Sequence, residues 1–243
     1  MELFVYGREA VAACAKLRPS ALREIRVVEG GDADAEFPVP VKRVPADELD
    51  RLAGTPAHGG IVARTERPEP AQVRPAMRDE WHAEGERVLF LDGITDADQL
   101  AAIMRLAVIC GVSRLIADER ACVPALCSPR AWSLSGGAAE SLKIYRTESM
   151  PGMVRMMGEK FFVVGFVREG GRRLDYAKAP VFPGRTTALY LSADANGVPA
   201  PMISRCGHLL HVPEPEDCPL RFAPADFAAL ALPWFAAKRK SGR

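Results

Sequence analysis

The chain has 243 residues, of which 48% are hydrophobic and 26% charged, with a formal net charge of +1. This composition is typical of a globular protein with a sizeable core, and it excludes a uniformly basic coat for nucleic acid while leaving room for a local basic patch. Because no apolar run approaches the roughly 18 residues of a membrane span and the first residues lack a secretory signal pattern, we expect a cytoplasmic protein with no membrane partner.

The first 65 residues predict a small α/β module. Helical spacing of apolar residues predicts helices from Arg8 to Leu17 and from Ala46 to Leu52. Short apolar runs predict strands at Ile25 to Val28, Val39 to Val44 and Gly60 to Ala63. Residues 66–84 then begin with the proline-rich stretch ERPEPAQVRPA, which is typical of a semi-rigid linker.

Residues 85–243 alternate apolar runs with helical segments and are expected to form a second domain. The runs are continuous, which predicts strands covered on both faces, so the fold class is α/β with a mostly parallel sheet. The expected strands are Val88 to Leu91, Val112 to Ala117, Leu142 to Tyr145, Phe161 to Val167, Thr187 to Leu191 and Leu209 to Val212. A last helix begins near Ala223, and Pro233 should kink or interrupt it.

This last helix carries more large apolar residues than one helix face normally needs. They are Phe222, Phe227, Leu230, Leu232, Trp234 and Phe235. Such an excess favours a homodimer, with core packing inside one chain as the alternative.

One arginine stands apart in the helix that follows the first strand of the second domain. The apolar stripe of this helix consists of Leu100, Ile103, Met104 and Ala107. Asp96 followed by Gln99 resembles a capping box at its start. Arg105 points away from the stripe, on the same face as Asp98, and therefore toward solvent or a cleft. From spacing alone, a solvated surface arginine is the simpler interpretation.

Four side chains of metal-binding type lie close together near the end of the chain: Cys206, His208, His211 and Cys218. Their spacing fits no common zinc finger. In a strand, HLLHV sends its two histidines to opposite faces. We therefore expect no metal site and buried or strand-end roles for these residues, with zinc as the less favoured alternative.

Five segments in a fixed order, YGREAV, HGGIVA, LDGITDADQLAAIMRLAVICGV, SLSGGAAESLKIYR and the tail from Leu189, resemble the SpoU family of RNA ribose 2′-O-methyltransferases. The resemblance covers nearly the whole chain. It implies an N-terminal RNA-binding module and a catalytic α/β domain whose C-terminal part forms a trefoil knot, an exception to the rarity of knotted chains. It also implies S-adenosylmethionine as cofactor, tRNA or rRNA as substrate, and a homodimer.

The same resemblance implies roles for individual residues. Arg105 matches the catalytic arginine, and Gln99 stands where the family has a catalytic-site asparagine. The cofactor is expected at Leu191, Ser192, Ala193, Asp194, Gly197, Val212, Leu220 and Arg221, and RNA contacts are expected at Arg8, Arg130, Ser135 and Glu140. A guanidinium suits this reaction because it stabilises the oxyanion that develops as a ribose hydroxyl attacks a methyl group.

The chain departs from the family pattern in three places. Gln99 and Ala101 replace asparagine and glycine, SADA at residues 192–195 replaces the usual cofactor loop, and residues 219–223 lack the usual amide and hydroxyls. If Ala195 needs a positive φ, the cost is of order 1 kcal/mol. Two interpretations stay open: an active methyltransferase, favoured by Arg105, and a noncatalytic RNA-binding protein of the same fold, favoured by the altered loops.

Overall fold

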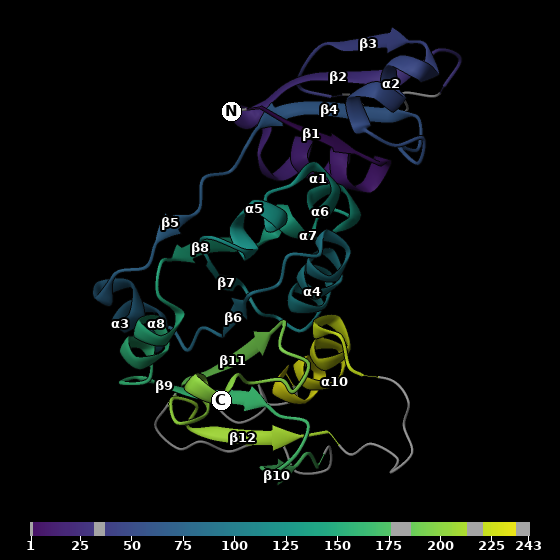
Figure 1. The fold of residues 1–243 in the computed structure, drawn as a ribbon. Helices are drawn as coiled ribbons and strands as arrows, with labels where there is room; N and C mark the ends of the chain where they lie inside the picture. Colours follow the sequence, from purple (N-terminus) through teal and green to yellow (C-terminus); the bar gives the residue numbers. More distant parts are fainter. Residues whose placement is uncertain (1, 32–36, 176–185, 213–220, 237–243) are drawn as a thin grey trace.

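A computed structural model describes residues 2–31, 37–175, 186–212 and 221–236. It shows a small N-terminal α/β module and a larger domain built on a parallel sheet (Figure 1). Both features of the predicted fold class are confirmed. The trefoil knot stays a prediction, because the connections into and out of the last strands include residues outside the described ranges.

The N-terminal module is a four-stranded sheet with one helix on each face. Its strands lie in the order β1 (Glu2–Tyr6), β4 (Ile61–Glu66), β2 (Leu22–Val28) and β3 (Val41–Val44), with only β2 and β3 parallel. Its helices are α1 (Arg8–Leu17), the short η1 (Pro19–Ala21) and α2 (Ala46–Ala53). The predicted helix from Arg8 to Leu17 is confirmed at both ends. Strand β1 was not predicted, since five residues at the chain start give too short a pattern.

The larger domain contains, within the described ranges, an eight-stranded sheet in which all neighbours run parallel. The order is β10 (Arg172–Arg173), β12 (His208–His211), β9 (Phe161–Phe166), β11 (Thr186–Ser192), β6 (Val88–Asp92), β7 (Arg114–Asp118), β8 (Lys143–Thr147) and β5 (Ala71–Gln72). The six strands predicted here are confirmed, with ends that differ by one or two residues.

Helices cover both faces of this sheet, as its continuous apolar strands predict (Figure 1). One face carries α4 (Ala97–Ile109), α5 (Cys122–Leu126), α6 (Pro129–Leu134), α7 (Ala138–Ser141) and α10 (Pro224–Ala236). The other carries α3 (Pro75–Ala83), α8 (Met150–Met157) and α9 (Ala200–Ile203). In β6, Leu89 and Leu91 pack on the first face and Val88 and Phe90 on the second.

The segment expected as a linker, residues 66–84, carries secondary structure of its own. Within it, β5 pairs with β8 at the edge of the large sheet. Helix α3 buries Trp81, which is 2% exposed, in the same cluster as Phe90 and Val88. Composition missed this helix because Pro75 lies in its first turn, where the missing N–H costs nothing.

Helix α10 continues through Pro233 to Ala236, so the predicted interruption does not occur. Its large side chains pack inside this chain: Phe227, Leu232, Trp234 and Phe235 are each at most 6% exposed and belong to the cluster around α4. The apolar excess of this helix is therefore explained by core packing and gives no support to a dimer.

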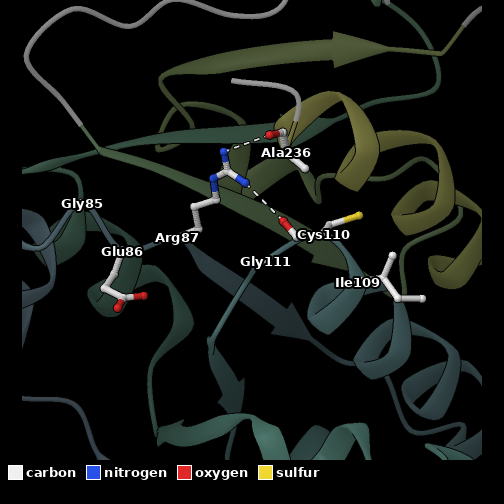
Figure 2. Close-up of a pocket in the computed structure, with 7 residues that line it drawn as sticks. All are labelled: Gly85, Glu86, Arg87, Ile109, Cys110, Gly111 and Ala236. Carbon is white, nitrogen blue, oxygen red and sulfur yellow. Dashed lines mark hydrogen bonds between the residues drawn. The ribbon is translucent and has the colours of Figure 1, made fainter. Parts of the chain in front are cut away.

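Arg87 joins the ends of α4 and α10. Its guanidinium donates from Nη1 to the carbonyl of Cys110 at 3.2 Å and from Nη2 to the carbonyl of Ala236 at 3.1 Å (Figure 2). The guanidinium carbon also lies 5.5 Å from the centroid of the Phe235 ring. A cation at a helix C-terminus interacts favourably with the helix dipole and with the carbonyls left unpaired there. A cavity of about 300 Å³ lies beside this junction, with Ile109 on its rim.

Arg87→Ala is expected to lower the free energy of unfolding by about 2 kcal/mol, because two helix ends lose their charged donor. Urea denaturation followed by circular dichroism measures this. Arg120→Ala is the control: Arg120 is exposed, and its loss should cost less than about 0.5 kcal/mol. Equal stability of the two variants would contradict a structural role for Arg87.

Candidate active site

The carboxyl ends of β6 and β11 bring two distant segments of the chain together. Leu91 pairs with Leu191 and Asp92 with Ser192, and the amide of Ala193 donates to the carbonyl of Asp92 at 2.9 Å. The helix of Arg105 therefore follows directly from a strand that lies beside the predicted cofactor loop. Ligands of open parallel sheets bind at this edge.

The predicted cofactor loop is closed by its own hydrogen bonds. The hydroxyl of Ser192 accepts from the amide of Asp194 at 3.0 Å. The carboxylate of Asp194 accepts from the amide of Asn196 at 2.8 Å, and its carbonyl accepts from the amide of Gly197 at 2.9 Å. The side chains at 193–196 are exposed, so this loop presents backbone and polar groups to solvent.

Gly197 is the residue in this loop that requires glycine. Its φ is +90°, and a Cβ placed on it would lie 2.0 Å from the carbonyl oxygen of Phe166. Among the described residues, only glycines have a positive φ. The strain considered for Ala195 is therefore absent, and the loop keeps its glycine where the backbone needs one.

The other predicted cofactor residues differ in exposure. Leu191 and Val212 are 2% and 6% exposed and belong to the same buried hydrophobic cluster. Arg221 is exposed just before α10, while Leu220 lies outside the described residues. The exposed loop offers backbone groups and the carboxylate of Asp194, which suit the polar ribose and amino-acid parts of S-adenosylmethionine.

Sequence reasoning missed a partly buried polar cluster at the same edge. The hydroxyl of Tyr190 donates to the carboxylate of Asp92. The carboxylate of Asp118 accepts from the amides of Gly93 at 2.8 Å and Ala121 at 2.7 Å. The signal was present, since Asp92 and Asp118 each end a buried parallel strand, and such ends meet at one edge.

The environment shifts the pKa values of these groups. Burial, together with the nearby Asp118 carboxylate, raises the pKa of Asp92, although the Tyr190 hydrogen bond opposes the rise. Burial and the Asp92 carboxylate raise the pKa of Tyr190. Burial also acts to raise the pKa of Asp118, but hydrogen bonds from Cys122, Ala121 and Gly93 hold it below its usual value.

Asp92→Asn is expected to be more stable than the original protein at neutral pH. A raised folded-state pKa means that ionised Asp92 destabilises the fold, a penalty that is complete above that pKa and absent below the unfolded-state pKa of about 3.9. Asparagine removes the charge and keeps an oxygen for Tyr190. The gain in melting temperature should therefore shrink as the pH falls toward about 4.

Tyr190→Phe provides the contrast for this measurement. Removing the hydroxyl removes the hydrogen bond that lowers the pKa of Asp92. The pH range over which ionisation of Asp92 lowers the melting temperature should therefore move to higher pH. A loss of stability in Asp92→Asn at neutral pH would contradict the assigned direction.

Arg105 and Gln99 lie on α4 in different surroundings. Arg105 is exposed, as its spacing predicts, and its side chain has no hydrogen bond or ion pair to another described residue. Asp96 caps the helix by accepting from the amides of Asp98 and Gln99. The side chain of Gln99 does not return to Asp96 as in a full capping box. Its Oε1 accepts from the amide of Ala225 at 3.0 Å instead, which joins α4 to the start of α10.

The four expected RNA contacts fall into two groups. Arg8 and Arg130 are exposed, and Nη2 of Arg130 donates to Oδ2 of Asp98 at 2.7 Å. Ser135 is 1% exposed, and its hydroxyl donates to the carbonyl of Trp132 and accepts from the amide of Ala139. The side chain of Glu140 is 2% exposed. In this structure the last two lie inside the protein.

The histidine and cysteine cluster does not form a group of metal ligands within the described residues. Cys218 lies outside them. Burial raises the pKa of Cys206 to about 12, which favours the protonated thiol over the thiolate that binds metal. Burial and Arg172 lower the pKa of His208.

Comparison with known proteins identifies the relatives of this chain. The SpoU rRNA Methylase family profile matches residues 86–219, more than half of the chain, and a profile for RNA 2′-O ribose methyltransferase substrate binding matches residues 4–71. The chain belongs to the SpoU rRNA methylase family. Transfer of a methyl group from S-adenosylmethionine to a ribose 2′-hydroxyl of RNA is the activity of this family.

Similar SpoU proteins span nearly the same length. The 23S rRNA (guanosine-2′-O-)-methyltransferase RlmB of Acinetobacter baylyi is 26% identical over 225 residues, covering 86% of this chain and 87% of that protein. RlmB of Escherichia coli K12 is 26% identical over 223 residues, covering 88% and 89%.

Solved structures share the fold. The SpoU methyltransferase AviRb from Streptomyces viridochromogenes in complex with the cofactor AdoMet has a TM-score of 0.72 at 17% identity, over 99% of this chain and 92% of that one. The AdoMet-bound rRNA methyltransferase from Sinorhizobium meliloti has a TM-score of 0.73 at 18% identity, over 100% and 88%. In the described part of the present SpoU chain, no helix is long and apolar enough to cross a membrane.

Proposed function

We propose that this protein methylates a ribose 2′-hydroxyl of ribosomal RNA, with Arg105 as the catalytic residue. The observation that supports the proposal is the pairing of β6 with β11, because the helix of Arg105 then follows a strand next to the loop expected to hold the cofactor, and Arg105 is exposed with no side-chain partner among the described residues. The names of the relatives, 23S rRNA guanosine 2′-O-methyltransferases, favour a guanosine of 23S rRNA over tRNA as the acceptor.

The proposed roles follow from the placement of each group. Bound S-adenosylmethionine supplies an activated methyl group on a sulfonium. Leu191 and Val212 hold its flat part, and the loop from Ser192 to Gly197 holds its polar parts. Arg105 orients the RNA phosphate and stabilises the negative charge that develops on the attacking ribose oxygen. Gln99 acts through its hydrogen bond to Ala225, by holding the start of α10 against the catalytic helix.

A noncatalytic RNA-binding protein is the competing function, and the SADA loop and Arg221 favour it. Isothermal titration with S-adenosylmethionine separates the two. Saturable binding with a dissociation constant in the micromolar range supports the enzyme, since the loop retains Gly197 and its turn geometry. No binding would leave RNA recognition as the function of this chain.

Arg105→Ala is expected to reduce turnover by two to three orders of magnitude, about the loss seen when one oxyanion-stabilising donor is removed. Arg105→Lys should recover only part of it, because lysine offers a charge without the planar fork. Methyl transfer from labelled S-adenosylmethionine to ribosomal RNA measures both variants, with RNA affinity measured at fixed salt.

The control for this substitution is a measurement of thermal stability. Arg105 lies off the apolar stripe of α4, so its loss opens no cavity and the melting temperature should stay within about 1 °C. Full activity in the alanine variant would remove Arg105 from the mechanism.

We further propose the cytoplasm as the location of this protein and a homodimer as its assembly. The family resemblance motivates the dimer, and the exposed apolar side chains Val108 and Ile109, 36% and 78% exposed at the end of α4, are the surface we assign to it. Ile109→Lys should convert a dimer to a monomer at micromolar concentration in sedimentation velocity. A monomeric original protein would contradict the assembly.

A further inference from the structure

The N-terminal module and the catalytic domain share one hydrophobic core. Leu3, Val5 and Ala10 of the module belong to the same buried cluster as Trp132 and Ala139 of the domain. Helix α1 contacts both α6 and α7, and strand β1 contacts α6 directly, so the module rests on the domain through a helix and a strand. A module joined only by residues 66–84 would have no such shared core.

A buried charge lies at the centre of this contact. Glu140 of α7 accepts from Nε of Arg18 at 2.8 Å, from Nη2 of Arg18 at 3.1 Å and from Nε1 of Trp132 at 2.8 Å. Arg18, at the end of α1, also donates to the carbonyl of Glu66 at 2.8 Å. A bidentate pair fixes direction as well as distance, and a carboxylate buried this deeply is costly without its partner.

Two backbone features bring the surfaces into close approach. The amide of Tyr6 donates to the hydroxyl of Ser133 at 2.9 Å. Gly137 has φ +92°, and a Cβ on it would lie 2.4 Å from the Cβ of Ala13 in α1. The turn between α6 and α7 therefore needs glycine to admit the module.

Residues at the edge of the contact between module and domain also pair with α4, the helix of Arg105. Arg130 of α6 pairs with Asp98 near the start of α4, and both shift the pKa of Tyr6, on the module, after the larger effect of burial. Arg105 follows Asp98 by seven residues on the same face of α4, a rise of about 10 Å. An RNA that crosses from the module to Arg105 passes over residues of both units.

We propose that Glu140 is a positioning residue that fixes the substrate-binding module on the catalytic domain through Arg18, so that RNA meets one preassembled surface running from the module over Arg130 to Arg105. This deepens the proposed function and rests on it. When RNA binds to a module that is fixed on the domain, the ribose to be methylated has a high effective concentration near Arg105. A loosely attached module would lower that effective concentration. Under this proposal, Glu140 acts through Arg18 and does not touch RNA.

The first experiment measures docking without RNA. Arg18→Met leaves Glu140 buried without its partner, and Gly137→Ala places a methyl against Ala13. In hydrogen–deuterium exchange of the full chain, both variants should exchange faster in α1 and in α6 and α7. Gly136→Ala is the matched control: its φ is also positive, at +59°, but its Cβ would meet only the end of the flexible Glu9 side chain.

The second experiment measures RNA binding and turnover in the same variants. With a transcribed 23S rRNA fragment, we expect KM to rise about tenfold in Arg18→Met and Gly137→Ala, while kcat at saturating RNA stays within about twofold. Affinity for S-adenosylmethionine should not change. The double variant Arg18→Met/Glu140→Gln, which neutralises the buried charge, should recover part of both docking and KM.

The outcomes are distinct. Faster exchange with unchanged KM would overturn the proposal, because docking would then serve stability alone. A double variant that binds RNA more weakly than Arg18→Met would also overturn it, because Glu140 would then contact RNA itself. If the original protein methylates no RNA, the proposed function fails, yet exchange and RNA affinity still decide whether the docked module binds as one surface.

Discussion

The pairing of β6 with β11 is the constraint on which the candidate active site depends. Each strand lies in the middle of the parallel sheet, buried on both faces. Their register sets Asp92 beside Ser192. The turn that leads to the helix of Arg105 and the loop expected to hold the cofactor therefore begin side by side at one edge of the sheet. A slip of one residue would turn the apolar side chains of one strand to the opposite face, which makes this register costly to change.

Local patterns in the sequence were enough for most of the fold and for the face of Arg105. Helix α1 and the buried strands follow from periodicity within about ten residues. Strand β5 and helix α3 were missed because what defines them is a distant partner: β5 is a strand through its contact with β8. Composition describes a chain segment and does not show what lies against it.

The candidate site shows the same limit at the level of single residues. A family motif predicted Ser135 and Glu140 as RNA contacts, but a motif does not tell which neighbour covers a side chain. In the structure, the side chains of Arg18 and Trp132 bind the carboxylate of Glu140, which is 2% exposed. Conversely, the altered residues of the cofactor loop favoured a noncatalytic protein in the sequence analysis. In the structure, the position in this loop that requires glycine is occupied by Gly197.

The core shared between module and domain also bears on how the chain folds as it is made. The amide of Tyr6 and the hydroxyl that it reaches in Ser133 are 127 residues apart. At the usual rate of synthesis, β1 and α1 leave the ribosome about ten seconds before α6 exists. During that interval Leu3, Val5 and Ala10 lack the side chains of α6 and α7 that lie in the same buried cluster. The module has two small clusters of its own, but the packing of Leu3, Val5 and Ala10 is therefore completed only after α6 and α7 have been made.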